Sequence, residues 1–60
     1  MLVTRKDVED YWKRYCERHH LDDEILAEGL RQVAINHEYW ADHTMRELED
    51  AVIKRLEQRN

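Results

Sequence analysis

Histidine and cysteine are the residues of this chain with the most specific chemistry. The sequence contains four histidines and a single cysteine, and Cys16 precedes His19 and His20 by three and four residues. On a helix, that spacing places the thiol and an imidazole on one side of a turn, and mixed Cys and His ligands are typical of zinc sites. A zinc site is therefore one alternative prediction, with five candidate ligands: Cys16, His19, His20, His37 and His43.

The spacing of the later histidines does not favour that zinc site. His37 and His43 are six residues apart, so on a helix they point in different directions. The pair His37 and Glu38 begins like the helical motif of zinc proteases, but Ala41 stands where the motif needs its second histidine. We predict instead that no metal and no other cofactor is bound, and that His19 and His20 complement the negative end of a helix dipole.

The sequence contains no recognisable catalytic motif. One glycine cannot build a phosphate-binding loop or a dinucleotide-binding motif, and no set of Ser, His and Asp suggests a nucleophile with its base. A chain of this length buries only about 60% of the surface that its unfolded form exposes, which makes a deep substrate cleft difficult to build. We therefore expect that the protein is not an enzyme and has no catalytic residues.

The charge pattern argues against nucleic acid and membrane partners. The net charge is −4, and bases alternate with acids one helical turn away, as in Asp10 with Arg14 and Asp50 with Lys54. Residues 22–42 contain six acids and one base, which predicts a solvated acidic face. The apolar runs are far shorter than the ~20 residues of a membrane span. Because the lone Cys16 cannot form an internal disulfide, we expect a cytoplasmic protein.

The elements that carry these residues are predicted to be helices throughout. The chain has one glycine and no proline, and its β-branched residues are scattered singly, so residues 1–60 are expected to form one all-α domain. Thr4 with Asp7 is a capping-box pattern that begins a helix over 5–20. Asp22 is the predicted cap of a second helix that begins at 23.

Two architectures remain open after residue 36. Thr44 with Glu47 is another capping-box pattern, which predicts a small three-helix bundle with helices over 5–20, 23–36 and 44–59. The alternative is a helical hairpin whose second helix continues to about 58 and dimerises into a four-helix bundle. An unbroken second helix would be about 54 Å long against about 24 Å for the first, which favours the bundle. The absence of glycine and proline between 36 and 44 favours the hairpin.

Helical spacing also predicts the core and the candidate binding residues. Tyr11 and Tyr39 lie near the edges of the apolar stripes, and together with Trp40 they are the predicted partner-binding residues, because large aromatic side chains are enriched at protein interfaces. In the hairpin alternative, Val52 and Leu56 would need a second chain for burial. The predicted core is Val8, Trp12, Tyr15, Leu26, Leu30, Val33, Trp40, Leu48, Val52 and Leu56.

These observations predict a non-catalytic helical protein-binding module. We expect a small acidic regulator, inhibitor or adaptor, of a kind that phages encode, acting on a protein partner, with a homodimer as its specific version. One alternative is a metal-binding helical protein with a Cys/His zinc site. Another is an engineered helical scaffold or binder, since well-capped helices also suit design.

Overall fold

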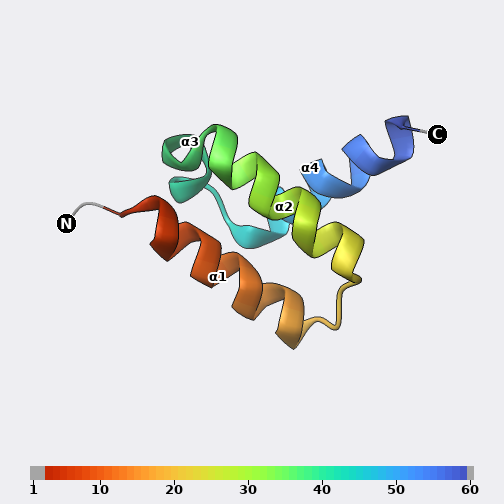
Figure 1. The fold of residues 1–60 in the computed structure, drawn as a ribbon, viewed down its shortest axis with the longest axis horizontal. Helices are drawn as coiled ribbons and strands as arrows, with labels where there is room; N and C mark the ends of the chain where they lie inside the picture. The colour runs from red at the N-terminus through yellow and green to blue at the C-terminus, as the bar shows by residue number, and fades with distance from the viewer. Residues whose placement is uncertain (1–2, 60) are drawn as a thin grey trace.

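Four helices, and no strand, occur in the part of the chain that the structure describes. The computed structural model describes residues 3–59 and contains α1 (Arg5–Arg18), α2 (Asp23–Ile35), α3 (His37–Ala41) and α4 (Met45–Gln58). The all-α prediction is therefore confirmed. Figure 1 shows α1 and α2 side by side, with α4 passing behind α2, and α2 contacts all three other helices. None of the described helices has the length and apolar character needed to cross a membrane.

Helix starts are determined by short hydrogen-bonded motifs. The amide of Asp7 donates to Thr4 Oγ1 at 3.2 Å, and the amide of Thr4 donates to Asp7 Oδ2 at 3.1 Å. The same reciprocal pair joins Thr44 and Glu47, at 3.1 and 3.0 Å. Both predicted capping boxes are confirmed. Asp22 occupies the N-cap position of α2, as predicted, but its side chain makes no capping hydrogen bond.

The first helix ends two residues earlier than predicted, at Arg18. The amide of Leu21 donates to the carbonyl of Cys16 at 2.9 Å, and the amide of His20 donates to that of Glu17 at 3.3 Å. This pair of bonds is the Schellman motif, which requires a left-handed residue directly after the C-cap residue, here His19. His20 supplies it with φ of 54°.

The hairpin alternative, with one unbroken second helix, is wrong. The backbone of Asn36 leaves the helical region, with φ of −154°, and ends α2. Its side-chain oxygen then accepts a hydrogen bond from the amide of Tyr39 at 3.3 Å, which begins α3. Asparagine competes with the helix in this way because its short side chain binds nearby backbone groups. The bundle thus has the three predicted long helices and one additional short helix, α3.

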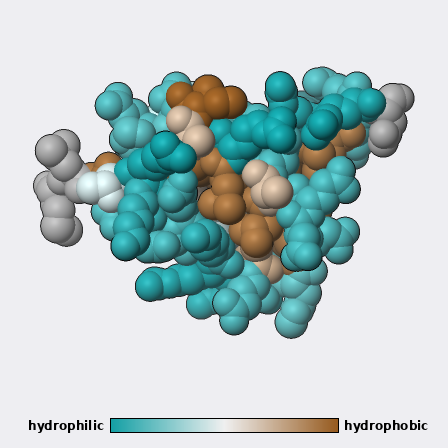
Figure 2. Space-filling model, viewed as in Figure 1, coloured by the Kyte–Doolittle hydropathy of each residue, from teal (hydrophilic) through white to brown (hydrophobic). Residues whose placement is uncertain are grey.

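The core lies where α1, α2 and α4 meet. Trp12 is fully buried, and its Nε1–H donates to the carbonyl of Leu26 at 2.9 Å. Val52 is also fully buried within the single chain, so it does not need the second chain that the hairpin alternative would have required. Figure 2 shows a band of hydrophobic residues across the middle of one face between hydrophilic ones, with smaller hydrophobic areas at the top and toward the right of the same face. The buried apolar residues are Val8, Trp12, Cys16, Val33, Trp40, Leu48 and Val52, and the other predicted core residues, Tyr15, Leu26, Leu30 and Leu56, pack against them while partly buried.

Candidate functional site

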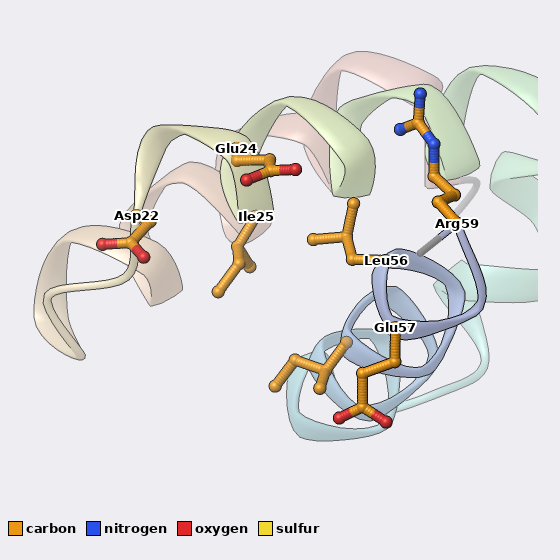
Figure 3. Close-up of a pocket in the computed structure, with 7 residues that line it drawn as sticks. Asp22, Glu24, Ile25, Leu56, Glu57 and Arg59 are labelled. Carbon is orange, nitrogen blue, oxygen red and sulfur yellow. The ribbon is translucent and has the colours of Figure 1, made fainter.

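A groove lined by aliphatic and charged residues opens between the start of α2 and the end of α4. Ile25 from α2 and Ile53 and Leu56 from α4 line it, and all three are only partly buried. Figure 3 shows Leu56 pointing from α4 toward α2, and Ile25 pointing from α2 into the space between the two helices. We call this hollow the α2/α4 groove. Aliphatic side chains left partly exposed in a hollow can bury further surface against another molecule.

The rim of the α2/α4 groove is mainly acidic. Asp22 and Glu24 line it from α2, and Glu57 and Arg59 line it from the end of α4. In Figure 3, Glu57 and Arg59 extend to opposite sides of α4, so the positive charge is confined to one side of the groove. An apolar floor with a mostly negative rim is complementary to an apolar segment that carries basic residues.

Three arginines, of which Arg59 is one, surround a single buried carboxylate. Glu28 on α2 is only 3% exposed, and its Oε2 accepts a hydrogen bond from Gln32 Nε2 at 2.9 Å. Arg55 Nε lies 3.5 Å from Oε2, while Arg59 Nη1 and Arg31 Nη1 lie 3.5 and 3.9 Å from Oε1. We call Arg31, Arg55 and Arg59 the arginine cluster. The prediction that the acids of 22–42 form a solvated face is wrong for Glu28.

The arginine cluster has a structural role, because it compensates the negative charge of the buried Glu28. Moving a carboxylate out of water costs several kcal/mol unless opposite charges and hydrogen bonds compensate it. Two of the compensating arginines come from α4 and its C-cap, Arg55 and Arg59, so the burial of Glu28 couples α4 to α2. The three guanidinium side chains themselves remain 57 to 61% exposed. The positive ends of these ion pairs are therefore accessible from solvent.

The candidate ligands of the alternative zinc site do not form a cluster in the structure. His19 and His20 are exposed at the end of α1, His37 begins α3, and His43 follows α3. Burial, with a further contribution from the carboxylate of Glu49, raises the pKa of the Cys16 thiol to about 11. Within residues 3–59, no three His, Cys, Asp or Glu side chains are grouped so that they could hold a metal ion.

The predicted partner-binding aromatics lie on separate surfaces. Tyr39 is 49% exposed, and its ring stacks on His43 with centroids 4.1 Å apart and meets Trp40 edge-on at 4.7 Å. Trp40 is buried and supports Tyr39 from the core side. Tyr11 is 51% exposed and lines a different hollow, with Met45. The two hollows share no residue, so the structure does not bring Tyr11 and Tyr39 together.

A tyrosine and a glutamate form a partly buried hydrogen bond between α1 and α4. The hydroxyl of Tyr15 on α1 donates to Glu49 Oε1 on α4 at 2.5 Å. Burial and then this bond to the carboxylate raise the pKa of Tyr15 to about 12. The pair joins α1 to α4, whose direct contact is otherwise limited, and the raised pKa of Tyr15 keeps the phenol neutral to a higher pH than in the unfolded chain.

Sequence reasoning missed Ile25, Ile53 and Glu28. Ile25 and Ile53 are each adjacent in sequence to a predicted core residue. An apolar neighbour of this kind widens the apolar stripe of a helix, and this pattern could have identified both residues. For Glu28, the nearest signals were Arg31 and Gln32 at i+3 and i+4, a spacing that also occurs on solvated helices. Comparison with known protein families, with characterised proteins and with solved structures finds no match to this chain.

Proposed function

We propose that this protein is a non-catalytic protein-interaction module whose α2/α4 groove receives a partner segment with apolar and basic residues. The observation that carries the proposal is the partly buried aliphatic floor of Ile25, Ile53 and Leu56 under a mostly acidic rim. In this role the module acts as a small regulator, inhibitor or adaptor. The proposal assigns the cytoplasm as its compartment, on the ground of the single thiol of Cys16.

The α2/α4 groove has the residue arrangement of a small protein interface. Apolar side chains at the centre with charged residues at the rim are the usual arrangement of protein interfaces. Grooves between helices commonly receive amphipathic helical segments, whose spaced apolar residues enter the groove while polar residues stay outside. The acids Asp22, Glu24 and Glu57 would then attract basic residues of the segment, in keeping with the net charge of −4.

Site-specific photo-crosslinking in cells tests the proposal. A photoreactive amino acid is introduced at Ile53 in the groove, and in a second variant at Ile35, the most exposed aliphatic residue of α2, as the matched control. We expect a defined protein adduct from position 53 and none from position 35. The same adduct from both positions would contradict the proposal, and a covalent dimer of this chain would identify a second copy as the partner.

Two further measurements separate groove binding from nonspecific capture. Ile53→Gln should abolish capture of the crosslinked partner, whereas Ile35→Gln should preserve it, with thermal melts by circular dichroism establishing that both variants are folded. Charge complementarity also predicts that capture weakens when salt rises from about 0.05 to about 0.5 M, because exposed charges are then screened. A complex unaffected by Ile53→Gln would place the partner elsewhere on the surface.

A further inference from the structure

The arginine cluster has positive charge that its own carboxylate does not balance. Arg31, Arg55 and Arg59 lie within 4.0 Å of Glu28, which leaves an excess of two positive charges on a protein whose net charge is −4. We propose that this cluster is a binding site for a phosphoryl group, the dianion whose charge equals that excess. This site goes beyond the proposed groove function and does not depend on it.

The hydrogen-bond donors of the cluster are available for such a ligand. The three arginines meet Glu28 at 3.5 to 3.9 Å, as ion pairs, and the hydrogen bond that Glu28 accepts comes from Gln32. Within residues 3–59, no hydrogen bond uses a guanidinium N–H of the cluster. Each guanidinium carries five such donors in a planar fork, a geometry that matches phosphate oxygens.

Burial of Glu28 pre-organises the site. Its carboxylate is 3% exposed and therefore cannot rotate into solvent without opening the contact between α2 and α4. The guanidinium groups from two helices are thus held near one point before any ligand arrives, which lowers the entropy cost of binding. A tetrahedral phosphoryl group can accept hydrogen bonds from several guanidinium forks at once, whereas a carboxylate is usually engaged by one or two.

Other acids lie near the cluster but do not pair with it. Asp22 and Glu24 line the α2/α4 groove together with Arg59, and Glu57 lies on the other side of α4. Among the described residues, none of these carboxylates comes within 4.0 Å of Arg31, Arg55 or Arg59. Because exposed charges are screened over about 8 to 10 Å at physiological salt, these acids reduce the excess positive charge less than a paired acid would.

Titration of the protein with inorganic phosphate tests the site. Ionic strength is held constant with chloride, and the arginine Nε–Hε signals are followed by nuclear magnetic resonance in ¹⁵N-labelled protein. We expect saturable shifts at Arg31, Arg55 and Arg59 and none at Arg5, which pairs with Glu9 at 3.1 Å elsewhere on the surface. Non-saturable shifts of similar size at all arginines would overturn the proposal, because they would indicate general charge screening.

Substitutions within the cluster give the quantitative test. Arg31→Gln and Arg55→Gln should each weaken phosphate binding about tenfold, which corresponds to about 1.4 kcal/mol and is near the lower end of what one hydrogen bond to a charged group contributes. Arg5→Gln removes the same charge and one ion pair, and should leave binding unchanged. An equal loss in Arg5→Gln and Arg55→Gln would overturn the site.

Substitution of Glu28 should change the phosphate affinity in the opposite direction. In Glu28→Gln the internal carboxylate no longer competes for the guanidinium groups, so phosphate should bind more tightly than to the original protein. If Glu28→Gln does not fold, which a thermal melt shows, the arginine substitutions decide the question. A folded Glu28→Gln protein with weaker phosphate binding would contradict the proposal.

The source of the phosphoryl group is decided by a second probe. Blocked O-phosphoserine is titrated beside inorganic phosphate under the same conditions. Tighter binding of phosphoserine supports a phosphorylated side chain as the natural ligand, and tighter binding of inorganic phosphate supports a free anion. Failure of both probes overturns the site while leaving the crosslinking result at Ile53, and with it the proposed groove function, untouched.

Discussion

The backbone of Gly29 on α2 lies directly against the indole ring of Trp12 on α1. A methyl group placed on Gly29 would overlap the ring atoms Cε2, Nε1 and Cζ2. The same indole donates its N–H to the carbonyl of Leu26, one turn earlier on α2, at 2.9 Å. The only glycine of the chain is therefore at a position where the indole ring leaves no room for a side chain on the helix surface.

Gly29→Ala should destabilise the protein. In an unobstructed helix this substitution would increase stability by about 1 kcal/mol, because alanine has the higher helix propensity. Here the methyl group overlaps a fully buried ring, and overpacking typically costs about 1 to 3 kcal/mol. Urea denaturation should show a lower free energy of unfolding for Gly29→Ala, and a more stable variant would refute the close contact. Ala34→Gly, at an exposed position of α2, should lose about 1 kcal/mol from propensity alone.

His20→Gly should stabilise the protein. His20 has φ of 54°, a left-handed conformation that costs a side-chain-bearing residue about 1 to 2 kcal/mol. Glycine avoids this cost but loses about 0.5 to 1 kcal/mol through its larger entropy in the unfolded chain. The net gain should be about 0.5 to 1 kcal/mol, or a rise of several degrees in Tm. His19→Gly, at φ of −96°, carries only the entropy loss and should lower Tm.

Stability should fall in alkaline solution because of Cys16 and Tyr15. The folded state raises the pKa of Cys16 from 9.0 to about 11 and that of Tyr15 from 10.0 to about 12. Above pH 9 the unfolded chain releases protons that the folded chain still holds, so each rise in pH favours unfolding. Stability from these groups is therefore complete below pH 9 and declines up to about pH 12. Urea denaturation from pH 8 upward checks this, and Tyr15→Phe should flatten the decline between pH 10 and 12.

The thiol of Cys16 should also react slowly. Only the thiolate attacks alkylating reagents, and both burial and the raised pKa keep the native thiol protonated at pH 8. We expect slow modification by iodoacetamide in buffer and rapid modification in concentrated urea. Equal rates in the two conditions would show that Cys16 is exposed.

The start of α4 should control part of the acid sensitivity. Hydrogen bonds from the Thr44 backbone and hydroxyl lower the pKa of Glu47. A lowered folded-state pKa contributes stability at pH values above the ordinary pKa of 4.5, and this contribution is lost as the pH falls through the folded value. Thr44→Ala should lower stability by about 1 kcal/mol at pH 7. Glu47→Gln and Thr44→Ala should both flatten the loss of stability below pH 4.5, and a Glu47→Gln curve parallel to the original would refute this.

Local motifs explain which parts of the fold were predictable. Thr4 with Asp7 and Thr44 with Glu47 are three residues apart, so their capping hydrogen bonds form within one turn and follow from the sequence alone. Helical spacing likewise identified most of the core, because the face of a helix depends only on residue intervals. The end of α1 was less predictable, since the sequence offers no glycine where His20 adopts its left-handed conformation.

Only the tertiary structure decided the residues of the candidate sites. Glu28 and Arg55 are far apart in the chain, and nothing in the local sequence of either residue specifies the other. The α2/α4 groove and the contact of Gly29 with Trp12 likewise depend on how two helices cross. Helix spacing determines which side of each helix is apolar, but the position and angle of one helix on another depend on packing of the whole core. The sequence therefore determined the helices and their faces, whereas packing decided which acid is buried, which glycine is needed and where the groove opens.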